Sequence, residues 1–147
     1  MELPELLLEY LHRKKVGVGF EIIGAELGMK AYVLIFPIEK KEEQIYRNNL
    51  LPIASYEVRY IKHKEEYTDT KWGLDYDYVL EDKDTRIKRF FIERNNENSN
   101  LLKVLSEFDI DFEDFKRLNF FDSALIDSPI ESYIKDKSIF PHLWKED

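Results

Sequence analysis

The residues best suited to chemistry in this chain are the acids of the stretch SEFDIDFEDFKRL, from Ser106 to Leu118. Five carboxylates and four apolar side chains occupy the nine residues from Glu107 to Phe115. Carboxylates at this density could bind a metal ion, transfer protons, attract a basic partner or begin a helix. The elements that position these side chains decide between those roles.

A calcium loop is the first of these roles that the spacing excludes. Asp109, Asp111 and Glu113 match positions 1, 3 and 5 of an EF-hand loop. That loop needs glycine at position 6 and a bidentate glutamate at position 12, where this chain has Asp114 and Phe120. Both departures remove groups that the ion requires, so no metal site is predicted here.

A helix start explains part of the acidic stretch. Asp111 is the predicted N-cap, and Glu113 and Asp114 would lie in the first turn, where negative charge is favourable. Glu107 and Asp109 would instead follow the preceding helix, where negative charge is mildly unfavourable. The apolar residues of the second helix would be Phe112, Phe115 and Leu118. Glu107 and Asp109 therefore remain unexplained by helix chemistry.

A second acidic constellation, Glu81-Asp82-Lys83, resembles the E-x-K motif of the PD-(D/E)xK nucleases. In such nucleases two carboxylates hold Mg²⁺ and the lysine helps to position the attacking water. The resemblance is short, because Glu39-Lys40-Lys41 has the same spacing, and acids at this point also suit a hairpin turn. The upstream acid of such a site would be Asp69, Asp75 or Asp77.

Other catalytic and cofactor motifs are missing from the sequence. The chain has no cysteine, which removes disulfides, thiolate nucleophiles and every cysteine-containing metal site. The three histidines, His12, His63 and His142, are far apart, and each is expected at the surface or its boundary. The pair Gly17 and Gly19 lacks the third glycine of a dinucleotide-binding loop. We therefore predict no cofactor, no metal and no enzyme activity.

Charge and hydropathy restrict the partners. Thirty acids against twenty-two bases give a formal net charge of −8. This balance disfavours nucleic acid and anionic membranes as partners. The longest apolar run, Ala31–Phe36, is too short to cross a bilayer, and the first fifteen residues lack the order of a signal peptide. These features predict a cytoplasmic protein.

The hydrophobic periodicity predicts one α+β domain over residues 1–147. An N-terminal helix (1–15) precedes a mainly β block (16–94) and a mainly α block (95–147) whose helices pack on one face of the sheet. In the third strand Glu57 and Arg59 should point outward, and the last strand should lie at an edge of the sheet. The five antiparallel strands are expected at 16–22, 30–36, 53–61, 76–80 and 86–93, with a hairpin turn at 81–84. Helices are expected at 39–49, from Leu101 to Phe108, from Asp111 onward, and after Ser128 as the N-cap of a capping box.

The combined profile favours a binding protein over an enzyme. Small immunity proteins, which neutralise bacterial toxins, share it, and an acidic inhibitor complements a basic nuclease toxin. Residues 99–147 carry eleven acids and six bases, so the acid is densest there. The predicted partner-binding residues are Glu107, Asp109, Glu113, Asp114, Trp72, Tyr76 and Asp77. The alternatives are a metal-dependent nuclease at Glu81 and Lys83, or a non-enzymatic regulatory or phage adaptor protein; the oligomeric state stays open.

Overall fold

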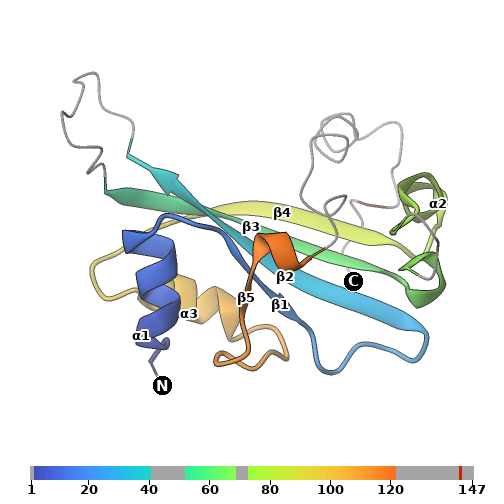
Figure 1. The fold of residues 1–147 in the computed structure, drawn as a ribbon, viewed down its shortest axis with the longest axis horizontal. Coiled ribbons are helices and arrows are strands. Elements are labelled where there is room, and N and C mark those ends of the chain that lie inside the picture. Colours follow the sequence, from blue (N-terminus) through green and yellow to red (C-terminus); the bar gives the residue numbers. More distant parts are fainter. Residues whose placement is uncertain (1, 41–51, 69–72, 122–142, 144–147) are drawn as a thin grey trace.

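The fold is described from a computed structural model, which covers residues 2–40, 52–68, 73–121 and 143. It is α+β, with a five-stranded antiparallel sheet in the order β4-β3-β2-β1-β5 (Figure 1). The strands are β1 (Val18–Glu21), β2 (Met29–Glu39), β3 (Ile53–Lys64), β4 (Arg86–Glu93) and β5 (Lys116–Arg117). The helices are α1 (Glu5–Leu8), α2 (Tyr76–Glu81) and α3 (Ser99–Leu105).

The N-terminal helix forms as its apolar spacing predicts. Leu3, Leu7 and Leu11 recur every four residues and are buried. They continue one apolar stripe from α1 into a π-helical turn, Glu9–Arg13. This stripe packs with α3 against one face of the sheet, and Figure 1 shows both helices beneath it.

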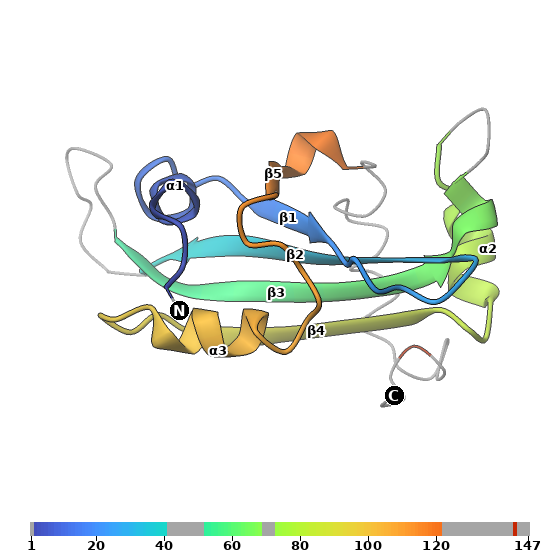
Figure 2. The same cartoon turned by 90° about the horizontal axis from the view of Figure 1, so that it is seen from below.

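The sheet separates two hydrophobic clusters, because successive side chains of a strand point to opposite faces. On the first face, Phe20, Val33 and Val58 pack with α1 and α3. On the second face, Leu34, Ile61 and Ile87 pack with α2 and with Leu143. Figure 2, turned by 90°, shows the strands side by side, with β4 at the edge opposite β5. Strand Arg86–Glu93 is therefore an edge strand, as predicted.

Two of the predicted elements are wrong. Residues 76–80 belong to α2, not to a strand; the carboxylate of Asp75 accepts a hydrogen bond from the backbone N–H of Tyr78 and caps the helix. The predicted helix after Asp111 is also absent, since Lys116–Arg117 pairs with Val18 and Gly19 as β5. The count of five strands holds only because β5 replaces the strand expected at 76–80.

Other predictions fall wholly or mainly outside the described residues. These are the helix at 39–49, of which Glu39 is the last residue of β2, and the capping box at Ser128. In the predicted C-terminal helical block, α3 is the one α-helix within the part of the chain that the structure describes. No helix in the described ranges is both long and apolar enough to cross a membrane.

Candidate functional site

The acidic stretch is a strap of turns and irregular backbone between α3 and β5, not the junction of two helices. Its apolar residues Phe108, Ile110, Phe112 and Phe115 pack against the first core cluster, while the five acids between them stay exposed. The carbonyl of Asp109 accepts a hydrogen bond of 2.8 Å from the backbone N–H of Ile23, just beyond β1. The alternation of acid and apolar residue from Glu107 to Glu113 therefore places the apolar side chains against the core and the acids in solvent without a helix.

Asp111 does not start a helix, although its carboxylate does satisfy a backbone group. It accepts a hydrogen bond of 3.0 Å from the backbone N–H of Glu113, and its carbonyl accepts one of 3.0 Å from that of Asp114. These two bonds close a local turn, after which the chain extends into β5. The predicted helix N-cap is therefore wrong: Asp111 closes a turn and no helix follows it.

The two acids that helix chemistry left unexplained, Glu107 and Asp109, line a groove of about 370 Å³. Its apolar lining includes Phe108 from the strap and Tyr60 from β3, whose rings are stacked with centroids 5.6 Å apart. Lys88 of β4 is the one cation among the described lining residues. The groove therefore combines aromatic surface with two carboxylates, and we call it the strap groove. Its remaining lining residues are Ile22 and Phe90.

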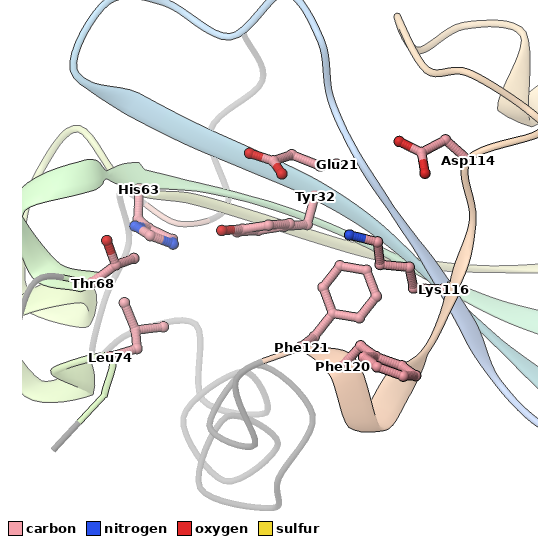
Figure 3. Close-up of a pocket in the computed structure, with 9 residues that line it drawn as sticks. All are labelled: Glu21, Tyr32, His63, Thr68, Leu74, Asp114, Lys116, Phe120 and Phe121. Carbon is pink, nitrogen blue, oxygen red and sulfur yellow. The ribbon is translucent and has the colours of Figure 1, made fainter.

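The other predicted interface residues do not join this groove. Asp114 lines a separate cavity of about 190 Å³ beside the second hydrophobic cluster (Figure 3). Glu113 is exposed and lines neither cavity, and Asp77 is exposed on α2. Trp72 lies outside the described residues, and for Tyr76 only the backbone in α2 is described. Of the acids on the strap, Glu107 and Asp109 thus line the strap groove, whereas Asp114 lines the second cavity.

The residues of the nuclease alternative do not converge in the described structure. Glu81 ends α2, and both it and Lys83 are exposed. Asp75 caps the same helix, while Asp69 lies outside the described residues. Within the described ranges, no three histidine, aspartate or glutamate side chains gather as a metal site.

Asp82, between these two residues, has a structural role. Its carboxylate accepts hydrogen bonds from the Tyr67 hydroxyl and, at 2.8 Å, from the backbone N–H of Asp84, and it lies 3.1 Å from the Lys64 ammonium. Burial alone would raise the pKa of Asp82, but these three partners outweigh it and lower the pKa. The hydrogen bond to Asp82 is also the main reason why the pKa of Tyr67 rises to about 12. Through these contacts Asp82 holds the end of α2 against the end of β3.

A buried charge cluster on β3 was not predicted. Glu57 and Arg59 were expected to point into solvent, but they are 6% and 3% exposed. The Glu57 carboxylate accepts from Nε of Arg59 at 2.7 Å and from Nε of Arg89 on β4 at 2.5 Å. The Arg59 guanidinium also lies 4.3 Å from the ring centroid of Phe36. The burial of this cluster depends on the neighbouring strands, because Phe36 is the cross-strand neighbour of Glu57 and Arg89 is that of Arg59.

Of the two described histidines, one agrees with the predicted surface or boundary position and the other does not. His63 is fully buried on the second face of the sheet, which contradicts the expectation of a surface or boundary residue. His12 is half-buried, which agrees with a boundary position. Burial, with a contribution from the positive charge of Arg94, lowers the pKa of His12 to about 4. Nε2 of His12 is hydrogen-bonded to the hydroxyl of Tyr56.

Known proteins do not supply a function by similarity. No protein-family model, no curated protein and no solved structure matches this chain.

Proposed function

We propose that this chain is a binding protein whose partner is a basic protein, and that it inhibits that partner as immunity proteins neutralise toxins. The observation that carries the proposal is the strap groove, where the carboxylates of Glu107 and Asp109 border the stacked rings of Tyr60 and Phe108. Carboxylates beside aromatic faces suit lysine and arginine side chains, because both groups attract a cation. Aromatic side chains are also enriched where protein interfaces bury their anchors.

The charge of the whole chain supports the same class of partner. A net charge of −8 repels nucleic acid and accelerates association with a basic protein. The acids of the strap stay exposed while its apolar residues are anchored in the core, so the charged surface is held on a fixed backbone. Such a surface loses little conformational entropy on binding.

The proposal is tested with the products of the genes adjacent to that of this chain. A neighbouring basic protein should be toxic when expressed alone, and co-expression with this chain should suppress that toxicity and yield a complex. If no neighbour binds and none loses toxicity, the immunity proposal is abandoned.

The binding surface is tested by charge reversal at the strap groove. Glu107→Lys combined with Asp109→Lys should weaken the complex by roughly tenfold or more at low salt, with a smaller effect at high salt, because exposed charges are screened. The matched control reverses two exposed acids on another element, Glu65 and Glu66, and should retain most of the affinity. Equal losses from both pairs would show a non-specific charge effect and would reject the strap groove.

A further inference from the structure

The second cavity, on the other face of the sheet, is built from several elements that converge on Tyr32. Tyr32 of β2 and His63 of β3 are buried within it, with ring centroids 5.9 Å apart. Phe121, which follows β5, contacts the same tyrosine edge to face, with centroids 5.8 Å apart. Tyr32 and Phe121 thus provide aromatic walls around a volume of about 190 Å³ (Figure 3).

Strand register places charged groups beside these walls. Glu21 is the cross-strand neighbour of Tyr32, so its carboxylate lies on the same face of the sheet as the ring. Lys116 pairs with Gly19, two residues before Glu21, and therefore projects from the same face. Asp114 follows on the strap, and Figure 3 shows the Lys116 ammonium directed towards Tyr32. Two carboxylates and one ammonium thus border the cavity.

These three charged side chains reach solvent at the cavity. Each is exposed, and none forms an ion pair with any of the residues that the structure describes. Together these three side chains carry a net charge of −1 beside aromatic surface, which favours a cation as the ligand. A guanidinium group matches the site best, because it stacks on a ring and also donates paired hydrogen bonds to carboxylates.

The size of the cavity limits what can enter. Pockets for complete small-molecule ligands occupy roughly 300–1,000 Å³, whereas this cavity measures about 190 Å³. That volume suits one long side chain supplied by a protein, in the manner of an anchor residue at an interface. Phe120 at the cavity is 73% exposed and offers the apolar contact that such a partner would cover.

We infer that this cavity, bordered by Glu21, Asp114 and Lys116, receives an arginine side chain of the basic partner. The inference rests on the proposed function and adds a second contact site to the strap groove. The guanidinium would stack against Tyr32 or Phe121 and bind the two carboxylates, displacing the Lys116 ammonium. Lys116 is therefore the group that competes with the incoming cation.

The cavity is tested without any partner by titrating the protein with N-acetyl-L-arginine amide, whose blocked termini leave only the side-chain charge. Amide resonances of Glu21, Tyr32, Asp114 and Phe121 should shift and saturate, with a dissociation constant on the order of 1–10 mM. N-acetyl-L-lysine amide should bind more weakly, because it cannot stack or form paired hydrogen bonds. Binding of N-acetyl-L-glutamate amide as strong as that of the arginine probe would overturn the inference.

Variants of the cavity residues are compared with a variant of a neighbouring acid, which separates a local contact from a general charge effect. Glu21→Gln and Asp114→Asn should each weaken arginine binding by about two- to fivefold, as expected for one exposed charge pair. Lys116→Gln should strengthen it by a similar factor, because the competing cation is gone. Glu113→Gln, a neighbouring exposed acid that does not line the cavity, should leave it unchanged. An equal loss from Glu113→Gln, or no gain from Lys116→Gln, would overturn the inference.

The complex with the partner separates this inference from the proposed function. If Glu21→Gln with Asp114→Asn weakens the complex, the arginine anchor is supported. If the complex depends on Glu107 and Asp109 but not on Glu21 and Asp114, the anchor is rejected while the proposed function stands. If no partner exists but the arginine probe binds as described, the cavity chemistry is supported and the proposed function alone fails.

Discussion

The hydrogen bond between His12 and Tyr56 should make the fold sensitive to mild acid. Tyr56 is 1% exposed, and its hydroxyl is hydrogen-bonded to Nε2 of the half-buried His12. Unfolding releases His12 to water, where its pKa is 6.5, whereas the folded value is about 4. Because the folded pKa is the lower one, the unfolded chain binds more protons between these two pH values. The contribution of His12 to stability is therefore fully present above pH 6.5 and is lost as the pH falls towards 4.

The magnitude follows from the two pKa values of His12. At about 1.4 kcal/mol per pH unit, complete protonation would cost the fold about 3 kcal/mol below pH 4. At pH 5 roughly 2 kcal/mol of this is lost, since the unfolded histidine is already charged there. The side chain is partly exposed, and solvent screening reduces the expected loss at pH 5 to about 1–2 kcal/mol.

The assay is urea unfolding of the wild type and of His12→Gln at pH 7.5 and pH 5. Glutamine retains an acceptor for Tyr56 but does not titrate, and the other ionisable groups are common to both proteins. The wild type should lose about 1–2 kcal/mol more than the variant between these pH values. Equal losses would refute the role of His12, as would an NMR titration that places its midpoint near 6.5.

Two further predictions concern the second face of the sheet. Glu57→Gln should destabilise the fold by about 3 kcal/mol or more, because it removes the buried carboxylate that accepts hydrogen bonds from Arg59 and Arg89. Glu57→Leu combined with Arg59→Met should recover part of that loss in urea unfolding. A loss below about 1 kcal/mol from Glu57→Gln would contradict the role of this buried pair. Gly19→Ala should cost about 1–3 kcal/mol, because its new Cβ would lie 2.6 Å from Cε2 of Phe121. Gly24→Ala is the control, because its new Cβ would meet only the flexible end of the Asp109 side chain. If both variants lower the thermal unfolding temperature equally, contact with Phe121 is not the cause.

Local patterns predicted the elements whose stabilisation depends on their own residues. The leucines at every fourth position required the first helix, and alternation in 53–61 required a strand with Tyr56 and Val58 facing the core. The same local reasoning failed at 76–80, where tyrosines alternate with other residues but an aspartate at position 75 caps a helix. The cap was present in the sequence as Asp75, and it outweighed an alternation of only five residues.

The acidic strap shows a conflict between two periods. Phe112, Phe115 and Leu118 fit a helix, whereas Phe108, Ile110 and Phe112 fit an extended chain. The strap forms no helix because Lys116 and Arg117 at its end pair with β1 and its aromatic rings pack against the core, and those contacts are with residues far away in the sequence. Burial of aromatic surface contributes more than the local preference of a few residues.

By itself, the sequence determined the general character of this protein. It is an acidic, cysteine-free α+β chain with an N-terminal helix, an antiparallel sheet and a run of exposed acids. Tertiary structure alone decided which charges are buried and which acids share a cavity. Glu57 alternates with core residues and so looked exposed, yet Phe36 and Arg89 from the neighbouring strands enclose it. Asp114 and Glu21 are ninety-three positions apart in the chain, and only the pairing of β5 with β1 brings them to one cavity. Local periodicity reports which side of an element faces a core, but burial of a charge depends on partners that only the folded chain supplies.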